Sequence, residues 1–201
     1  MGKELEYKLE VGDPELLEKI MADPQIEALS SEGFHQTAMR TEYFDSPNQR
    51  FSQRHWTLRR RQEGETSVIC VKTPTGERHT RGEWQIIEKT LDDKAIIRLM
   101  EAGAPKELLF LYGAGDVEPV CGAEFQRKHK MLCFPDGSEA ELACDQGLLL
   151  GKTENMPLCE VELELYIGAP EEMLQLVRYL CDTYGLKEQP KSKVARARSL
   201  K

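Results

Sequence analysis

The sequence predicts an α+β protein whose centre is a closed, eight-stranded antiparallel β-barrel with flanking helices. Three observations favour this fold class: eight stretches with the two-residue alternation of strands, turn-forming residues between several of them, and a few helical segments that interrupt the series. The 201 residues are 40% hydrophobic and 31% charged, which suits one globular core. Because the chain contains no repeat, low-complexity tract or long linker, we expect a single domain over residues 1–201.

Strand alternation is clearest in two segments far apart in the chain. Residues 3–11 place Glu4, Glu6 and Lys8 on one face and apolar side chains on the other, and residues 158–167 repeat this with glutamates. The other predicted strands are residues 35–45, 55–63, 66–73, 81–89, 122–134 and 138–146.

Helices are predicted for residues 14–22, 92–102, 105–112 and 170–184. The first follows Asp13, a favourable N-cap, and begins with Pro14, which is tolerated at the first helical position. The last carries an apolar stripe at helical spacing and stops at Gly185. Such amphipathic helices suit the outside of a barrel.

The overall charge excludes several classes of partner. The chain has 27 basic and 35 acidic residues and a net charge of −8, so we expect no nucleic acid and no membrane partner. The opening residues, MGKELEYKLEV, lack the apolar core of a secretory signal, and no run of about 18 apolar residues follows. The expected location is therefore cytoplasmic, and a homodimer is compatible with the sequence.

The six cysteines are scattered singly, without a C-x-x-C pair or a histidine at zinc-ligand spacing. We interpret them as reduced, partly buried thiols.

Charges of both signs recur on the strand faces. Besides the first and last strands, charged side chains at strand spacing are Arg59 and Arg61, Arg81 and Glu83, Glu141 and Asp145, Lys72, and Arg127 with His129. One such strand is ordinarily explained by a solvated face, but recurrence from strand to strand favours a shared interior. Eight strands can close a barrel that holds side chains or one small ligand. The apolar faces would then point outward, beneath the helices.

Mixed charge in one cavity has a chemical meaning. Carboxylates at positions i and i+2 of a strand lie roughly 7 Å apart and can supply the oxygen ligands that Mg²⁺ or Mn²⁺ requires. Lys and Arg donors suit phosphate oxygens. Unpaired buried charge is heavily penalised, so the pattern favours a metal-bound polyphosphate as the ligand.

A series of motifs spans nearly the whole chain in a fixed order. They are Glu4-Leu5-Glu6-Tyr7-Lys8 for E-x-E-x-K, Tyr43-Phe44-Asp45-Ser46-Pro47 for Y-F-D-T-P, Leu58-Arg59-Arg60-Arg61 for L-R-x-R, Lys72, Arg81-Gly82-Glu83 for R-x-E, Glu141 to Gly147 for E-x-x-x-D-x-G, Glu160 to Leu165 for E-x-E-x-E-L, and Ser192-Lys193 with Arg196 for S-K-x-x-R. In this order they resemble the CYTH superfamily, also called triphosphate tunnel metalloenzymes. The resemblance implies a divalent-metal-dependent hydrolase of a small-molecule triphosphate, most simply inorganic tripolyphosphate.

The resemblance also implies roles for individual residues. It implies that the metal ligands, for Mg²⁺ or Mn²⁺, are Glu4, Glu6, Asp145, Glu160 and Glu162. It implies that the triphosphate is bound by Lys8, Arg59, Arg61, Lys72, Arg127 and Lys193, and that the catalytic residues are Glu4, Glu6 and Lys8.

Several positions remain open at this stage. Arg81 and Glu83 are left without a role, because a Lys/Arg–Glu pair across neighbouring strands is as easily structural, and His129 fits a polar wall residue. A β-bulge would exchange Arg127 and Lys130, so either can face the interior. The basic C-terminal segment resembles a disordered tail in composition, but its Ser-Lys motif implies that its start folds back over the tunnel.

Three other functions stay open. Class IV adenylate cyclases of the same superfamily convert ATP to cyclic AMP and pyrophosphate and need an adenine pocket. Thiamine triphosphatases need a stacking aromatic near the tunnel mouth, for which Trp56 and Trp84 are candidates by residue type. A non-catalytic polyphosphate- or nucleotide-binding module would bind without turnover.

Overall fold

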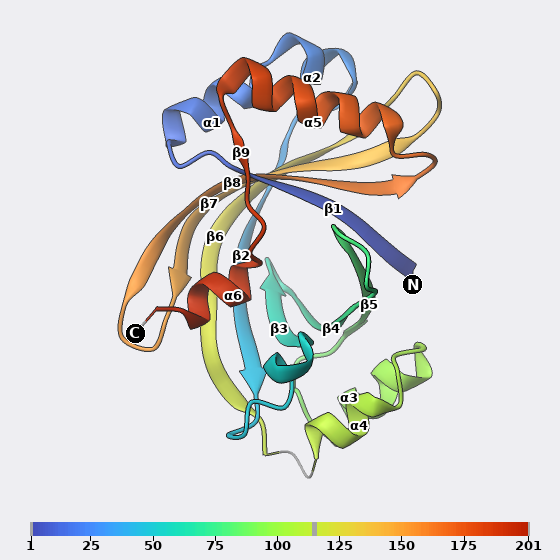
Figure 1. Cartoon of the computed structure of the whole chain (residues 1–201), viewed down its shortest axis with the longest axis vertical. Coiled ribbons are helices and arrows are strands. Elements are labelled where there is room, and N and C mark those ends of the chain that lie inside the picture. The colour runs from blue at the N-terminus through green and yellow to red at the C-terminus, as the bar shows by residue number, and fades with distance from the viewer. Residues whose placement is uncertain (1, 114–115, 201) are drawn as a thin grey trace.

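The computed structural model describes residues 2–113 and 116–200, and within them eight antiparallel strands close into a barrel (Figure 1). The strands are β1 (Gly2–Glu10), β2 (His35–Asp45), β3 (Thr57–Glu63), β4 (Thr66–Pro74), β5 (Thr80–Ile87), β6 (Glu118–Cys133), β7 (Glu139–Leu150) and β8 (Asn155–Ile167). They are hydrogen-bonded in the order β5-β4-β3-β2-β6-β7-β8-β1, and β1 also pairs with β5. This confirms the predicted fold class.

Strand β1 closes the barrel by pairing with β5, but only over its first residues. Its first residues pair with β5, from Gly2 opposite Glu83 to Leu5 opposite Thr80. Its last residues pair instead with β9 (Lys187–Glu188), a short strand just before the C-terminal helix. The strand that carries the first charged motif is therefore held by segments from three parts of the sequence.

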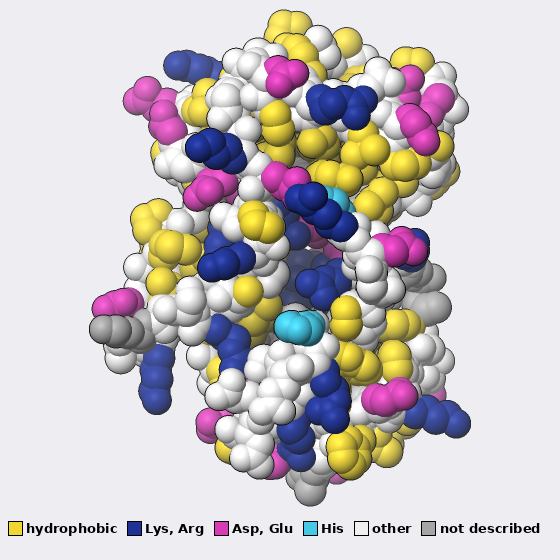
Figure 2. Space-filling view, viewed as in Figure 1, with side chains coloured by type: hydrophobic (Ala, Val, Ile, Leu, Met, Phe, Trp, Pro, Cys, Tyr) yellow, Lys and Arg dark blue, Asp and Glu magenta, His cyan; other side chains and the backbone are white. Residues whose placement is uncertain are grey.

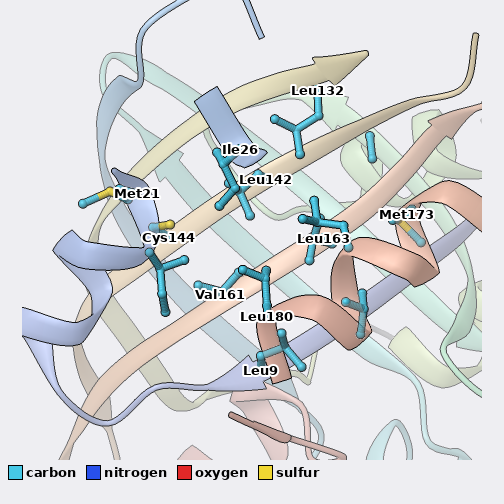
Figure 3. Close-up of a cluster of buried hydrophobic side chains, with 14 of the residues drawn as sticks. Leu9, Met21, Ile26, Leu132, Leu142, Cys144, Val161, Leu163, Met173 and Leu180 are labelled. Atoms are coloured by element: carbon cyan, nitrogen blue, oxygen red, sulfur yellow. The ribbon is translucent and has the colours of Figure 1, made fainter. Parts of the chain in front are cut away.

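Two apolar layers lie on the outside of the barrel. On one side, α1 (Pro14–Met21), α2 (Pro24–Ala28) and α5 (Glu171–Tyr184) cover the outward faces of strands that include β1, β7 and β8. Figure 3 shows this cluster, in which Met21, Ile26 and Leu180 of the helices surround Leu142 and Val161 of the strands. On the other side, α3 (Asp93–Glu101) and α4 (Glu107–Tyr112) cover β3, β4 and β5. Burial of apolar surface in these layers stabilises the barrel from outside.

Local signals explain where the helices start. Asp13 accepts a hydrogen bond from the backbone N–H of Glu15 at 2.9 Å, as expected of an N-cap. Asp23 caps α2 in the same way and also accepts hydrogen bonds from the hydroxyls of Tyr179 (2.9 Å) and Tyr184 (2.6 Å), so it ties α2 to α5. The sequence did not predict α2, because five residues are too few to show a helical period.

Other differences concern boundaries and the C-terminal segment. The long strands β6 and β7 extend beyond the predicted 122–134 and 138–146, and both pair along almost their whole length. The segment predicted to fold back forms a helix, α6 (Lys193–Arg198), which packs against β6 and β7. None of the helices within residues 2–113 and 116–200 has both the length and the apolar character needed to cross a bilayer.

Candidate functional site

The barrel encloses a cavity of about 1070 Å³ that is lined by charged side chains. Nine of the predicted site residues line it: Glu4, Glu6, Lys8, Arg59, Arg61, Lys72, Arg127, Glu162 and Lys193. Figure 2 shows basic side chains set deep in the middle of one face of the molecule. The charged strand faces therefore point inward, as the alternation pattern led us to expect.

The two remaining predicted residues, Asp145 and Glu160, are fully buried behind Lys193. The choice between Arg127 and Lys130 is resolved by the register of β6, which runs without interruption from Cys121 to His129 against β2. Arg127 points into the cavity, while Lys130 is buried on the outer side, with its Nζ 3.3 Å from Glu27 Oε1 of α2.

Two groups of carboxylates lie in the interior. The first, which we call the Glu4 cluster, consists of Glu4, Glu83 and Glu164, from β1, β5 and β8. The second, the Asp145 cluster, consists of Asp145, Glu160 and Glu162, from β7 and β8. In each group, one oxygen from every member lies within 4.8 Å of the others.

The Glu4 cluster has fewer cations than carboxylates. Lys72 Nζ lies 2.5 Å from Glu4 Oε1 and 3.2 Å from Glu83 Oε2, and Arg59 lies 3.4 Å from Glu83. Glu164 makes no ion pair with any residue that the structure describes. An oxygen-rich group with unpaired negative charge suits a divalent cation.

The pKa values of Glu4 and Glu164 are raised in keeping with this shortage of positive charge. Burial raises the pKa of Glu4 to about 8, against the opposing effect of Lys72, and burial raises the pKa of Glu164 to about 7. Glu83 behaves differently, because Lys72 and Arg59 outweigh its burial and lower its pKa to about 2. Without a metal ion, the Glu4 cluster therefore holds protons near neutral pH.

The Asp145 cluster is fully neutralised. Arg127 binds both oxygens of Asp145, at 2.8 and 2.7 Å, and reaches Glu162 at 2.6 Å. Lys193 contacts all three carboxylates, and Arg196 pairs with Glu160. Lys193 and Arg127 outweigh the burial of Glu162 and hold its pKa well below the usual value.

The helix α6 delivers two of these cations. Ser192 caps it by accepting a hydrogen bond from Ala195 N at 3.2 Å, and Lys193 is its first residue. Arg198, near its end, binds Asp45 at 2.6 Å, which fixes the helix to the loop after β2. Asp45 also accepts backbone N–H groups from that loop, so the Y-F-D segment acts as an anchor for α6.

Two further basic side chains of the cavity each form an ion pair with a single carboxylate. Lys8 pairs with Glu6 and Arg61 with Glu63. Burial alone would raise the pKa of Glu6, but Lys8 and Lys72 hold it below its usual value. Donors held by single carboxylates can exchange them for phosphate oxygens, because both are anionic acceptors.

A CYTH domain model matches residues 2–197 of the chain. The chain belongs to the CYTH family. An inorganic triphosphatase from Haemophilus influenzae is 27% identical over 143 residues, which are 69% of this chain and 39% of that protein. The chain thus matches well under half the length of this curated relative.

Solved structures share the CYTH fold. A protein from Hippeastrum, described as a candidate adenylyl cyclase with a dominant triphosphatase activity, aligns over 99% of this chain and 96% of its own, with a TM-score of 0.59 and 15% identity. A candidate adenylate cyclase from Bacillus halodurans aligns over 96% of both chains, with a TM-score of 0.60 and 14% identity. These similarities confirm the fold.

Within this CYTH domain, Glu83 and Glu164 are the site residues that the sequence predictions left out. Glu164 shares its strand face with Glu160 and Glu162, so the period of two already pointed it inward. Glu83 was left open because it also fitted a structural Lys/Arg–Glu pair across neighbouring strands. It does lie opposite Lys72 of β4 and pairs with it, and it also contacts Arg59 within the Glu4 cluster. No sequence signal showed that these two carboxylates meet Glu4.

Proposed function

We propose that this CYTH protein is a divalent-metal-dependent triphosphatase that hydrolyses a phosphoanhydride bond, with inorganic tripolyphosphate as its substrate. The observation that supports this most directly is the Glu4 cluster itself, which is short of positive charge and lies in the same enclosed cavity as eight lysine and arginine side chains. A cavity that holds carboxylates short of cations beside basic side chains that can exchange carboxylate for phosphate oxygens fits a metal ion together with a polyanion.

The donor set fits a hard cation. Glu4, Glu83 and Glu164 offer only carboxylate oxygens, which Mg²⁺ and Mn²⁺ prefer, and Glu164 has no competing ion pair among the described residues. A bound ion would neutralise charge on the phosphate chain and polarise the bond that breaks. Glu6, two residues from Glu4 on the same face of β1, is placed to support the same ion.

The basic residues position the substrate. Arg59 and Lys72 lie beside the Glu4 cluster, while Lys8, Arg127 and Lys193 lie beside Glu162. Together they can hold a triphosphate in an extended arrangement, and positioning with electrostatic stabilisation supplies most of the catalysis in phosphoryl transfer. A carboxylate that is free of the ion can take the proton from the attacking water. No serine or histidine nucleophile is needed.

The substrate assignment rests on two observations. The Haemophilus influenzae relative is named an inorganic triphosphatase. In addition, Trp56 and Trp84, the tryptophans that could have stacked on an organic group, pack outside the barrel against the layer of α3 and α4. An adenine or thiamine group would have to find another aromatic partner.

Phosphate release by the purified chain tests the proposal. We expect Mg²⁺- or Mn²⁺-dependent release from tripolyphosphate that exceeds release from ATP and thiamine triphosphate. Glu4→Gln should lose roughly 100-fold or more in kcat/KM, whereas Glu65→Gln, in an exposed turn, should match the wild type.

Each rival function has its own outcome in this assay. Cyclic AMP and pyrophosphate from ATP would identify a cyclase, and a preference for thiamine triphosphate would identify that hydrolase. Tight binding of tripolyphosphate with no turnover of any of the three substrates would identify a binding module and overturn the proposal.

A further inference from the structure

Two histidines lie side by side at the end of the tunnel where β2 begins. His35 is the first residue of β2 and lies directly opposite His129 of β6, with ring centroids 6.0 Å apart and ring planes tilted by 52°. Two residues further along these strands, Thr37 lies opposite Arg127, and both line the cavity, as does His129. Because side chains two residues apart share a strand face, the two imidazoles belong to the inward face, at its outer end.

A carboxylate orients the ring of His129. Its Nδ1 lies 3.0 Å from Oε2 of Glu141 on β7. The residue opposite His129 on β7 is Ala143, whose small side chain leaves room for Glu141, two residues earlier on the same face, to reach the ring. A carboxylate only accepts hydrogen bonds, so Nδ1 carries the proton and Nε2 keeps a free lone pair. A histidine held in this way by its other nitrogen is oriented to bind a metal ion.

Glu32 places a carboxylate beside the second histidine. Its Oε2 lies 3.6 Å from Nε2 of His35, which is too long for a hydrogen bond. On a tetrahedral Zn²⁺ with bonds of about 2.0–2.1 Å, ligand atoms lie about 3.3–3.6 Å apart and two bound imidazoles have centroids roughly 5–6 Å apart. The observed separations lie at the upper end of these ranges. The side chains of Glu32 and His35 are 72% and 68% exposed, so small rotations can bring them onto one ion without disturbing the core.

The type of donor distinguishes this group from the Glu4 cluster. Imidazole nitrogens suit Zn²⁺, whereas Mg²⁺ prefers the oxygen-only ligands that the Glu4 cluster offers. A nearby cation does not oppose binding, because Arg127, 3.8 Å from Glu141, is already neutralised by Asp145 and Glu162.

We propose that this end of the tunnel carries a Zn²⁺ site whose ligands are His35, His129 and Glu32. Water completes the tetrahedron, and Glu141 acts as a positioning residue for His129. The ligands come from the loop before β2, from β2 and from β6, so only the folded barrel brings them together. None of the three belongs to the Glu4 cluster or the Asp145 cluster, so the proposal does not depend on the proposed function.

Nuclear magnetic resonance of the histidine ring nitrogens tests the proposal directly. The chain has four histidines, so each ring can be assigned by substitution. During a Zn²⁺ titration with excess Mg²⁺ and without substrate, the Nε2 signals of His35 and His129 should shift together along one binding curve, while those of His55 stay in place. A response from only one of the two rings, or from neither, would overturn the proposal.

Variants separate the ligands from the positioning residue. His35→Ala should weaken Zn²⁺ binding at His129 roughly 100-fold, whereas Glu141→Gln should weaken it roughly 10-fold with both rings still responding. The matched control is His55→Asn, at another exposed histidine, because asparagine tolerates the φ of 57° found there. Unchanged Zn²⁺ affinity at His129 in His35→Ala would refute the site. These measurements involve no turnover, so a chain that hydrolyses no triphosphate would still give the expected shifts.

Discussion

The two carboxylate clusters of the tunnel contain equal numbers of acids but differ in how they are balanced. The Asp145 cluster is matched cation for carboxylate and is closed off by α6, whereas the Glu4 cluster lacks a partner for Glu164. Removing one partner of a buried ion pair destabilises the fold, because the other charge is left buried without compensation. A cluster with more carboxylates than cations instead favours the binding of a cation. The comparison separates a half of the tunnel whose ion pairs stabilise the fold from a half whose unpaired carboxylates suit a metal ion.

The largest effect should come from breaking the balanced half. Asp145→Asn removes the negative charge and one of the two oxygens that Arg127 binds at Asp145, in a fully buried position, and we expect a loss of about 3–5 kcal/mol in the free energy of unfolding. Urea denaturation measures it, with the exposed Asp182→Asn as the matched control. A loss below about 1 kcal/mol would mean that the Asp145 cluster has no structural role.

The next largest effect should come from the Glu4 cluster, and it should appear in metal binding and activity instead of in the stability of the fold. Glu164→Gln should weaken Mn²⁺ binding and kcat/KM by roughly 100-fold, while the metal-free chain should not be destabilised, because Glu164 has no described ion-pair partner to lose. Titration with Mn²⁺ and urea denaturation on the same preparation test both parts. Destabilisation without weaker metal binding would reverse the assignment of the two halves.

The carboxylates Glu4 and Glu164 should respond to pH with the opposite sign to Glu162. The pKa values of Glu4 (about 8) and Glu164 (about 7) are raised in the folded chain, so the metal-free protein binds more protons folded than unfolded, and its stability should fall as pH rises from about 4.5 to about 8. The pKa of Glu162 is lowered, so its contribution should be lost only as pH falls below the usual carboxylate range. Thermal unfolding with and without Mn²⁺ measures this, and Mn²⁺ should abolish the loss of stability on the alkaline side.

The smallest effect concerns the mouth of the tunnel. Tyr166 follows Glu164 on the same face of β8 and is 57% exposed, so it is the aromatic placed to meet an organic group that extends from the metal-binding half. Tyr166→Ala should leave kcat/KM for tripolyphosphate within about twofold, because an exposed ring makes no phosphate contact. A selective loss with ATP or thiamine triphosphate would instead identify an organic pocket.

Periodicity made the fold predictable, together with most of the inward-facing charges. The alternation in β1 and β8 already assigned Glu4, Glu6 and Glu162 to one side of their strands, and an apolar opposite face required a covering layer. The Ser-Lys motif placed Lys193 over the tunnel, although not as a helix.

The grouping of the carboxylates could not be predicted. Which acids meet depends on the stagger of strands around a closed barrel, and alternation within one strand carries no information on stagger. The sequence therefore could not show that Glu4, Glu83 and Glu164 form one cluster, although each stood on a charged strand face. Likewise, the charges of Asp145 and Lys193 were visible in the sequence, but no pattern showed that the two side chains form an ion pair.

The double pairing of β1 has a consequence for biosynthesis. Leu5 lies between Thr80 of β5 and Leu165 of β8, so the strand that carries Glu4 and Glu6 has no complete partner set until the ribosome has released residues far downstream. At a translation rate of roughly 5–20 residues per second, this strand stays incompletely paired for many seconds while the middle of the sheet forms. The nascent chain can therefore build the walls of the tunnel early, but it can seal the ring of charges only at the end of synthesis.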